Sequence, residues 1–193
     1  MKFWTVQNKY TLDKIIEDGI YHPDINFKSS FVTKADNAYN IIKRSYELMN
    51  NNIRVTGLIF GLTEYMDNPI TSYDEYKHVI ADSGTSGIST SKDDFYVLEL
   101  EVPDNINLAS CQFYNFADLL YYFDIEPQYS SHEDRQIAIN CLFSKDSCLN
   151  LVQSHIHYID KSMIKNIYKS YEYYLGDIYG KCEDLEYYKK ELL

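Results

Sequence analysis

Apolar and polar positions divide this chain into a mixed series of strands and helices. Large apolar residues predict a strand over residues 3–7, and helical spacing of apolar residues predicts a helix over 8–18. Gly19 would end that helix, because glycine readily adopts the left-handed conformation at a helix C-terminus. A polar turn with Tyr21 and His22 follows. This arrangement would bring polar side chains from the strand end and the turn close together, as many ligand sites require.

The remaining pattern predicts further helices and strands in no repeating order. Capped or periodic stretches predict helices over residues 33–50, 115–123, 131–143 and 183–193, with a short helix inside 69–80. Apolar or alternating stretches predict strands over 53–62, 95–102, 107–111 and 150–159, while 164–173 suits either type. We therefore expect an α+β fold, one domain over residues 1–193, with a mostly antiparallel central sheet and helices packed around it.

Two of the helices have a local physical basis. Ala38, Ile41, Ile42, Tyr46 and Met49 recur at helical spacing and would form a buried face. Ser131 precedes Asp134 by three residues, which predicts a capped helix start.

Composition narrows the class of protein. Nearly half of the 193 residues are apolar, and no apolar run approaches the length of a membrane span. Polar residues begin too close to the start of the chain for a signal peptide. The four cysteines show neither a Cys-x-x-Cys pair nor the spacing of a zinc site. We therefore expect a cytoplasmic protein with free thiols. Abundant Asn, Lys, Ile, Tyr and Asp indicate an AT-rich coding genome, as in many bacteria and their phages.

The net charge of −11 bears on the partners of the chain. Such a field repels the phosphate backbone, so we expect no direct nucleic-acid binding face. The acidity favours solubility and also suits binding of a basic protein surface. Tyrosines between Tyr168 and Tyr188, interleaved with Glu172 and Asp177, would form the acidic, Tyr-rich surface of such a protein-binding protein. Biased codon usage together with ordinary helix and strand packing explains the same number of tyrosines and is the preferred interpretation.

Three carboxylates are candidates for catalysis or for simple structural roles. Glu99 and Glu101 would share one face of a strand, opposite Leu98 and Leu100. An exposed face of an antiparallel strand explains this pair fully. Glu133 at a helix start is equally explained by favourable placement of an acid near the N-terminus.

A metal-like pattern occurs in the predicted strand 150–159. Gln153, His155 and His157 would project from one face, and two neutral imidazoles can share a metal. A third ligand is not identifiable, so surface histidines on a solvent-facing strand are the preferred interpretation, and we expect no metal. A metal-dependent hydrolase built on His155 and His157 stays as a weaker alternative. The Gly/Ser stretch 83–87 lacks phosphate-loop spacing and suggests a loop.

Four short motifs are distinctive: Lys2-x-Trp4-Thr5-x-Gln7, Gly19-x-Tyr21, the run 95–110 and Leu151-Val152-Gln153. Together they resemble an uncharacterised bacterial family, the domain of unknown function 3841. The resemblance covers nearly the whole chain and implies no biochemical activity.

A looser resemblance is to ADP-ribosyltransferase-like proteins, which also open on a strand, a helix ending in Gly and an aromatic turn. In that fold a first-strand Arg or His binds NAD, and a later Glu orients the ribose. Here Gln7 and His22 would substitute for the former. The stretches 89–91 and 99–101 resemble the Ser-Thr-Ser and Glu-x-Glu signatures. The resemblance implies NAD bound near Trp4, Gln7 and Tyr21, with His22 and either Glu101 or Glu133 as catalytic groups. The alternative is a non-enzymatic, acidic inhibitor or docking protein.

Overall fold

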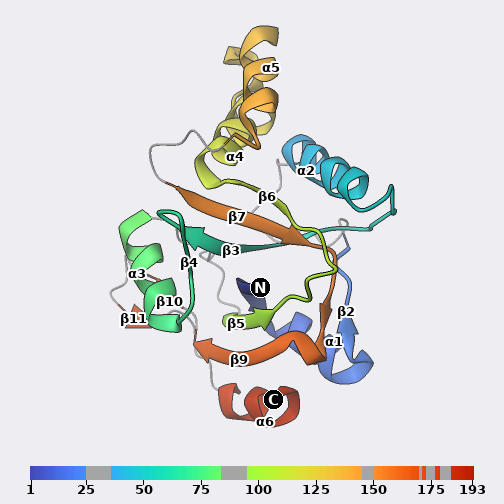
Figure 1. Cartoon of the computed structure of the whole chain (residues 1–193), viewed down its shortest axis with the longest axis vertical. Helices are drawn as coiled ribbons and strands as arrows, with labels where there is room; N and C mark the ends of the chain where they lie inside the picture. The colour runs from blue at the N-terminus through green and yellow to red at the C-terminus, as the bar shows by residue number, and fades with distance from the viewer. Residues whose placement is uncertain (25–35, 84–94, 145–149, 170, 173–176, 179–183) are drawn as a thin grey trace.

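The computed structural model of the chain describes residues 1–24, 36–83, 95–144, 150–169, 171–172, 177–178 and 184–193. A central sheet runs through the middle of the molecule in the strand order β6-β7-β3-β1-β5-β9, with β4 paired to β3 (Figure 1). Its strands are β1 (Lys2–Asn8), β3 (Ile59–Tyr65), β4 (Asn68–Pro69), β5 (Phe95–Glu101), β6 (Ala109–Gln112), β7 (Leu151–Ile156) and β9 (Ile164–Lys169).

Every strand pairing within the described residues is antiparallel. Two short ladders lie beside the central sheet. One joins β2 (Ile20–Tyr21) to β8 (Ile159–Asp160), and the other joins β10 (Tyr171–Glu172) to β11 (Asp177–Ile178). The predicted mostly antiparallel sheet is therefore confirmed.

Helices pack around this sheet, as the sequence predicted. They are α1 (Lys9–Asp18), α2 (Asp36–Met49), α3 (Tyr73–Ser83), α4 (Phe113–Leu120), α5 (His132–Cys141) and α6 (Leu185–Leu192), together with the π-helical turn η1 (Tyr121–Ile125) and the 3-10 turns η2 (Pro127–Tyr129) and η3 (Lys161–Met163). None of the described helices is long and apolar enough to cross a membrane.

Helix α1 forms where the sequence placed it because both of its ends are capped. The Asn8 side chain accepts a hydrogen bond from the backbone N–H of Thr11 at 3.0 Å. At the other end Gly19 has a φ of +76°, and its N–H donates to the Ile15 carbonyl. The chain thus leaves the helix sharply and enters β2 with Tyr21, which precedes His22.

The side chains of β1 divide between the two faces of the sheet. Phe3 packs in an apolar cluster with α1 and α6, whereas Trp4 packs in a second cluster with α3. A third cluster joins α2, α4 and α5. Gly61 on β3 allows β1 to approach closely, since a Cβ there would lie 2.4 Å from Phe3 Cε1. The space beside Gly61 is therefore filled by protein.

Several predicted strands have different limits in the structure. The stretch 53–62 becomes a strand only at Ile59, after a loop that follows α2. The single strand expected over 150–159 is two, β7 and β8, with His157 between them. The undecided stretch 164–173 begins with strand β9 because Ile164 and Ile167 pair with β5 and enter the first apolar cluster.

Candidate functional site

Two histidines that are distant in the sequence lie side by side in the structure. The ring centroids of His22 and His157 are 6.2 Å apart. The ring of Tyr158 lies 5.8 Å from His22 and 4.6 Å from His157, and the hydroxyl of Tyr46 lies 2.6 Å from Nδ1 of His157. We call His22, Tyr46, His157 and Tyr158 the histidine–tyrosine cluster.

The pairing of β2 with β8 brings this cluster together. Tyr21 pairs with Ile159, so His22 and Tyr158 follow as facing positions beyond the ladder. At the opposite end of this ladder, the Gly19 carbonyl accepts a hydrogen bond from the Lys161 N–H at 2.8 Å. The segment after His22 is fixed by Thr56, whose hydroxyl donates to the Pro23 carbonyl at 2.7 Å. The backbone therefore fixes where the His22 side chain begins.

Tyr46 enters the cluster from the buried face of α2, next to Ala38 and Ile42 on the same side of that helix. Burial, with a further contribution from Tyr158, raises the pKa of Tyr46 to about 12, so the phenol is protonated at neutral pH. The protonated phenol can donate its hydrogen to Nδ1 of His157, and we take this direction for the neutral ring. The neutral His157 ring then carries its proton on Nε2.

The charge of His157 is controlled by its surroundings. Burial, and secondarily the neighbouring His22, lower the pKa of His157 below its usual 6.5. The ring is therefore mainly neutral at pH 7 and offers Nε2–H as a hydrogen-bond donor. No described carboxylate contributes to this shift. His22 is exposed, so an incoming ligand can reach its ring.

The three residues expected to bind NAD do not share one surface. Trp4 is fully buried, donates its Nε1–H to the Ile70 carbonyl at 2.8 Å and stacks on Tyr76. Gln7 lies on the opposite face of β1, because an odd number of positions separates it from Trp4. Its amide donates to the Thr5 hydroxyl. Tyr21 is the last residue of β2, and the next residue in the chain is His22 of the cluster.

Neither proposed catalytic carboxylate has His22 among its contacts. Glu101 is half exposed and accepts a hydrogen bond from the amino group of Met1 at 3.0 Å. Glu133 is exposed in the first turn of α5. In Figure 1 this helix stands at the top of the molecule, well away from β2. The structure therefore does not join Glu101 or Glu133 to the histidine–tyrosine cluster.

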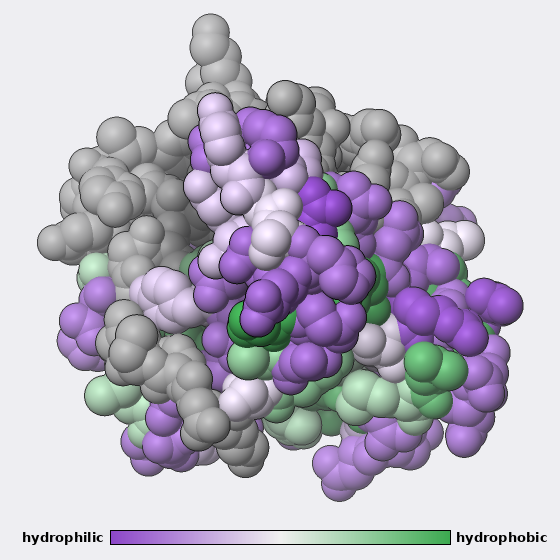
Figure 2. Space-filling model, turned by 90° about the horizontal axis from the view of Figure 1, so that it is seen from above, coloured by the Kyte–Doolittle hydropathy of each residue, from purple (hydrophilic) through white to green (hydrophobic). Residues whose placement is uncertain are grey.

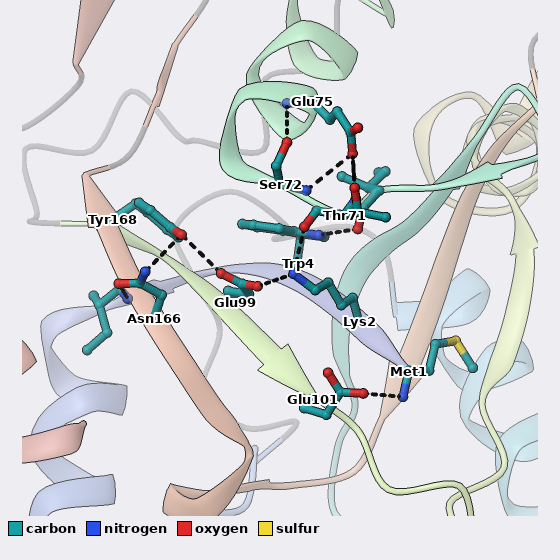
Figure 3. Close-up of polar contacts among 12 residues, drawn as sticks. Met1, Lys2, Trp4, Thr71, Ser72, Glu75, Glu99, Glu101, Asn166 and Tyr168 are labelled. Atoms are coloured by element: carbon teal, nitrogen blue, oxygen red, sulfur yellow. Dashed lines mark hydrogen bonds and ion pairs between the residues drawn. The ribbon is translucent and has the colours of Figure 1, made fainter.

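Glu99 is the member of the Glu99/Glu101 pair that the structure buries. Both share a face of β5, as predicted, but the expected exposed face is wrong for Glu99, whose side chain is only 12% exposed. It accepts hydrogen bonds from the ammonium group of Lys2 at 2.5 Å and from the hydroxyl of Tyr168 at 3.0 Å (Figure 3). Asn166 donates to the same hydroxyl. All four groups satisfy one another, which is typical of a structural network.

Gln153 and His155 are buried, not solvent-facing as the sequence indicated. They lie on β7 under α4, and the ring of His155 faces Phe116. The Ala109 carbonyl can only accept, so Nδ1 of His155 donates to it at 2.8 Å and Nε2 accepts from the Gln153 amide at 2.9 Å. Both ring nitrogens thus have protein partners, and His157 lies beyond the end of the strand. The described residues contain no group of three metal-ligating side chains.

The Tyr-rich surface expected near the C-terminal end is only partly within the described residues. Tyr188 is buried and donates to Asp13, and Tyr168 stacks on Tyr73 with ring centroids 4.2 Å apart. Tyr187 is exposed. The side chains of residues 170–183 lie outside the described part, as do residues 84–94, which include most of the Gly/Ser stretch and the Ser-Thr-Ser stretch.

Sequence reasoning missed Tyr46, Tyr158 and Glu99 as members of polar clusters. Tyr46 fits the apolar face of a helix, and nothing in its spacing indicates that its hydroxyl meets a histidine. On a continuous strand Tyr158 would point to the face opposite His157, but the strand ends at Ile156. Glu99 is held by Lys2 and Tyr168, which are distant in the sequence, so no local pattern reveals its partners.

Comparisons with models of known families, with curated proteins and with solved structures found no match.

Proposed function

We propose that this protein binds NAD, or a nucleotide of the same chemistry, at the histidine–tyrosine cluster. The observation that carries the proposal is the hydrogen bond between Tyr46 and Nδ1 of His157, with the His22 ring beside it. This arrangement orients one imidazole and leaves a second one accessible. The choice of NAD comes from the ADP-ribosyltransferase-like features of the first 24 residues.

The side chains of the cluster suit both the phosphates and the flat bases of such a ligand. The Nε2–H of a neutral His157 can donate to a phosphate oxygen without carrying a charge into the site. The ring faces of His22 and Tyr158 can stack on nicotinamide or adenine, because aromatic rings stack on any flat base. A ligand placed there would lie between the β2–β8 ladder and α2.

The proposal is for binding, not for transfer of ADP-ribose. Loss of nicotinamide develops positive charge at the ribose, and a carboxylate must stabilise that charge. Glu101 binds the Met1 amino group instead, and Glu133 belongs to α5. A non-catalytic relative of ADP-ribosyltransferase-like proteins fits these placements best.

Thermal unfolding in the presence of NAD tests the proposal. A ligand at a hundred times its dissociation constant stabilises a protein by about 2.7 kcal/mol, so we expect a clear rise in Tm at millimolar NAD. The His22→Ala/His157→Ala double variant should lose this rise. A His78→Ala/His132→Ala variant is the matched control, since both of these histidines are exposed and outside the cluster.

The outcomes separate binding from catalysis. If wild-type Tm does not change with NAD, or if both double variants keep the same rise, the proposal is wrong. Release of nicotinamide, measured by chromatography, should stay at the level of the buffer blank. Release that depends on His22 would instead show an active transferase.

A further inference from the structure

The end of the molecule built from α4, η1, η2 and α5 exposes an unusual amount of apolar surface. Thirteen large apolar side chains are exposed among the described residues, and six of them lie within residues 121–143. This unit stands at the top of Figure 1, and Figure 2 looks onto it, with hydrophobic atoms exposed among hydrophilic ones. We call these six the α4–α5 surface: Tyr121, Ile125, Tyr129, Ile137, Ile139 and Phe143.

Three of the six lie close together in the sequence, on the two turns η1 and η2 that join α4 to α5. Tyr121, Ile125 and Tyr129 follow one another at intervals of four residues through η1 and η2, with exposed fractions of 40%, 58% and 76%. The Tyr121 hydroxyl donates to Glu126 at 2.5 Å, so a carboxylate lies directly beside this row. Contiguous exposed apolar groups rimmed by polar ones are typical of protein interaction sites.

The fold itself turns these side chains outward. Asp124 points inward and accepts the backbone N–H groups of Asn37 and Ala38 at 3.1 and 2.9 Å, which caps α2. With Asp124 held in this way, the adjacent Ile125 faces solvent.

Helix α5 is anchored to the same unit by one arginine. Arg135 donates to the Pro127 carbonyl at 2.6 Å and to the Ser130 hydroxyl, and its guanidinium lies over the ring of Phe123. The apolar row on η1 and η2 and the exposed residues of α5 therefore belong to one connected frame.

Charge indicates what kind of partner this surface accepts. Residues 113–143 contain five acidic residues, of which Asp124 is buried, and one arginine, Arg135, which is already engaged. A second copy of the chain would bring the same acidic groups, and a net charge of −11, against each other. A cationic partner would instead meet complementary charge.

We propose that the α4–α5 surface docks a basic amphipathic segment of another protein, with apolar side chains on one face and Lys or Arg on the other. The apolar face would cover Tyr121, Ile125 and Tyr129. The basic residues would pair with carboxylates such as Glu126 and Glu133. This inference is independent of the NAD proposal, because it uses a different part of the molecule.

A fluorescein-labelled amphipathic helical peptide of Leu and Lys is the probe, measured by fluorescence anisotropy. We expect binding that weakens as salt rises and that falls at least tenfold in the Ile125→Ser/Tyr129→Ser variant. The matched control is Leu48→Ser/Tyr187→Ser, which removes one aliphatic and one tyrosine side chain that are 53% and 52% exposed elsewhere, and it should bind like wild type. A Glu126→Lys/Glu133→Lys variant should also bind at least tenfold more weakly.

Three results would overturn the inference. The first is equal loss of binding in the surface variant and the control variant. The second is equal affinity for a peptide with Glu in place of Lys. The third is a dimer in analytical ultracentrifugation that Ile125→Ser/Tyr129→Ser converts to monomer, which would assign the surface to self-association. Circular dichroism of each variant confirms that the fold is retained.

Discussion

The hydroxyl of Tyr46 lies 2.6 Å from Nδ1 of His157, across 111 residues of sequence. The phenol comes from the core side of α2, and the imidazole comes from the connection between β7 and β8. The bond orients the ring of His157, and where the phenol is the donor, a neutral ring carries its proton on Nε2. The histidine–tyrosine cluster thus has one preset ring and one accessible ring, His22, beside it.

Coupling between the two rings should be visible in a titration. Burial and His22 both lower the pKa of His157, with burial the larger cause. In the His22→Gln variant we expect the pKa of His157 to rise while staying below 6.5, because burial persists. Histidine side-chain NMR from pH 4 to 8 measures it. A His157 pKa that is the same in both proteins would contradict the coupling.

Glu99 and Glu101 provide a matched pair on one strand. Glu99→Gln leaves Lys2 and Tyr168 without their ionised partner, so we expect a loss of about 2 kcal/mol in the free energy of unfolding. Glu101→Gln removes only an exposed ion pair and should cost less than about 0.5 kcal/mol. Urea unfolding at pH 7 compares them. Equal losses would mean that the Glu99 network adds no stability.

Gly61→Ala tests the close packing of β1 and β3. The added Cβ would lie 2.4 Å from Phe3 Cε1 and 2.5 Å from the Trp4 carbonyl oxygen, so the backbone of β1 must move. We expect a loss of at least about 2 kcal/mol, measured by denaturant unfolding. Gly19→Ala would be destabilising for another reason, its positive φ, since nothing lies within 4 Å of that position. Trimming Phe3 to Leu should relieve only part of the Gly61→Ala loss, because the Trp4 carbonyl remains.

His155 should make the fold sensitive to mild acid. Burial lowers the pKa of His155 to about 4, whereas the unfolded chain takes up this proton near 6.5. The unfolded state therefore binds more protons than the folded state between these values, and stability falls as the pH drops from 6.5 towards 4, by up to about 3 kcal/mol. His155→Gln should be less stable at pH 7 but show a flatter dependence over pH 6.5–4.5. An unchanged slope would show that other groups cause the acid sensitivity.

Helices whose ends are fixed by their own capping residues were predicted well from the sequence. Asn8 and Gly19 define the ends of α1, and Ser131 with Asp134 forms the expected capping box of α5. Hydrogen bonds over three or four residues need only the nearby sequence. The strand expected over 150–159 was too long, because its alternation continues through the connection that places His157.

The amino-acid pattern alone determined the α+β class, the antiparallel character of the sheet and the helical face that carries Tyr46. Periodicity and caps are local properties, so they can be read without knowing what packs against them. Only the tertiary structure decided which polar groups meet. It paired His22 with His157 and buried Glu99 and His155. Those outcomes depend on strand order and register between distant segments, which the periodicity of a single segment does not encode.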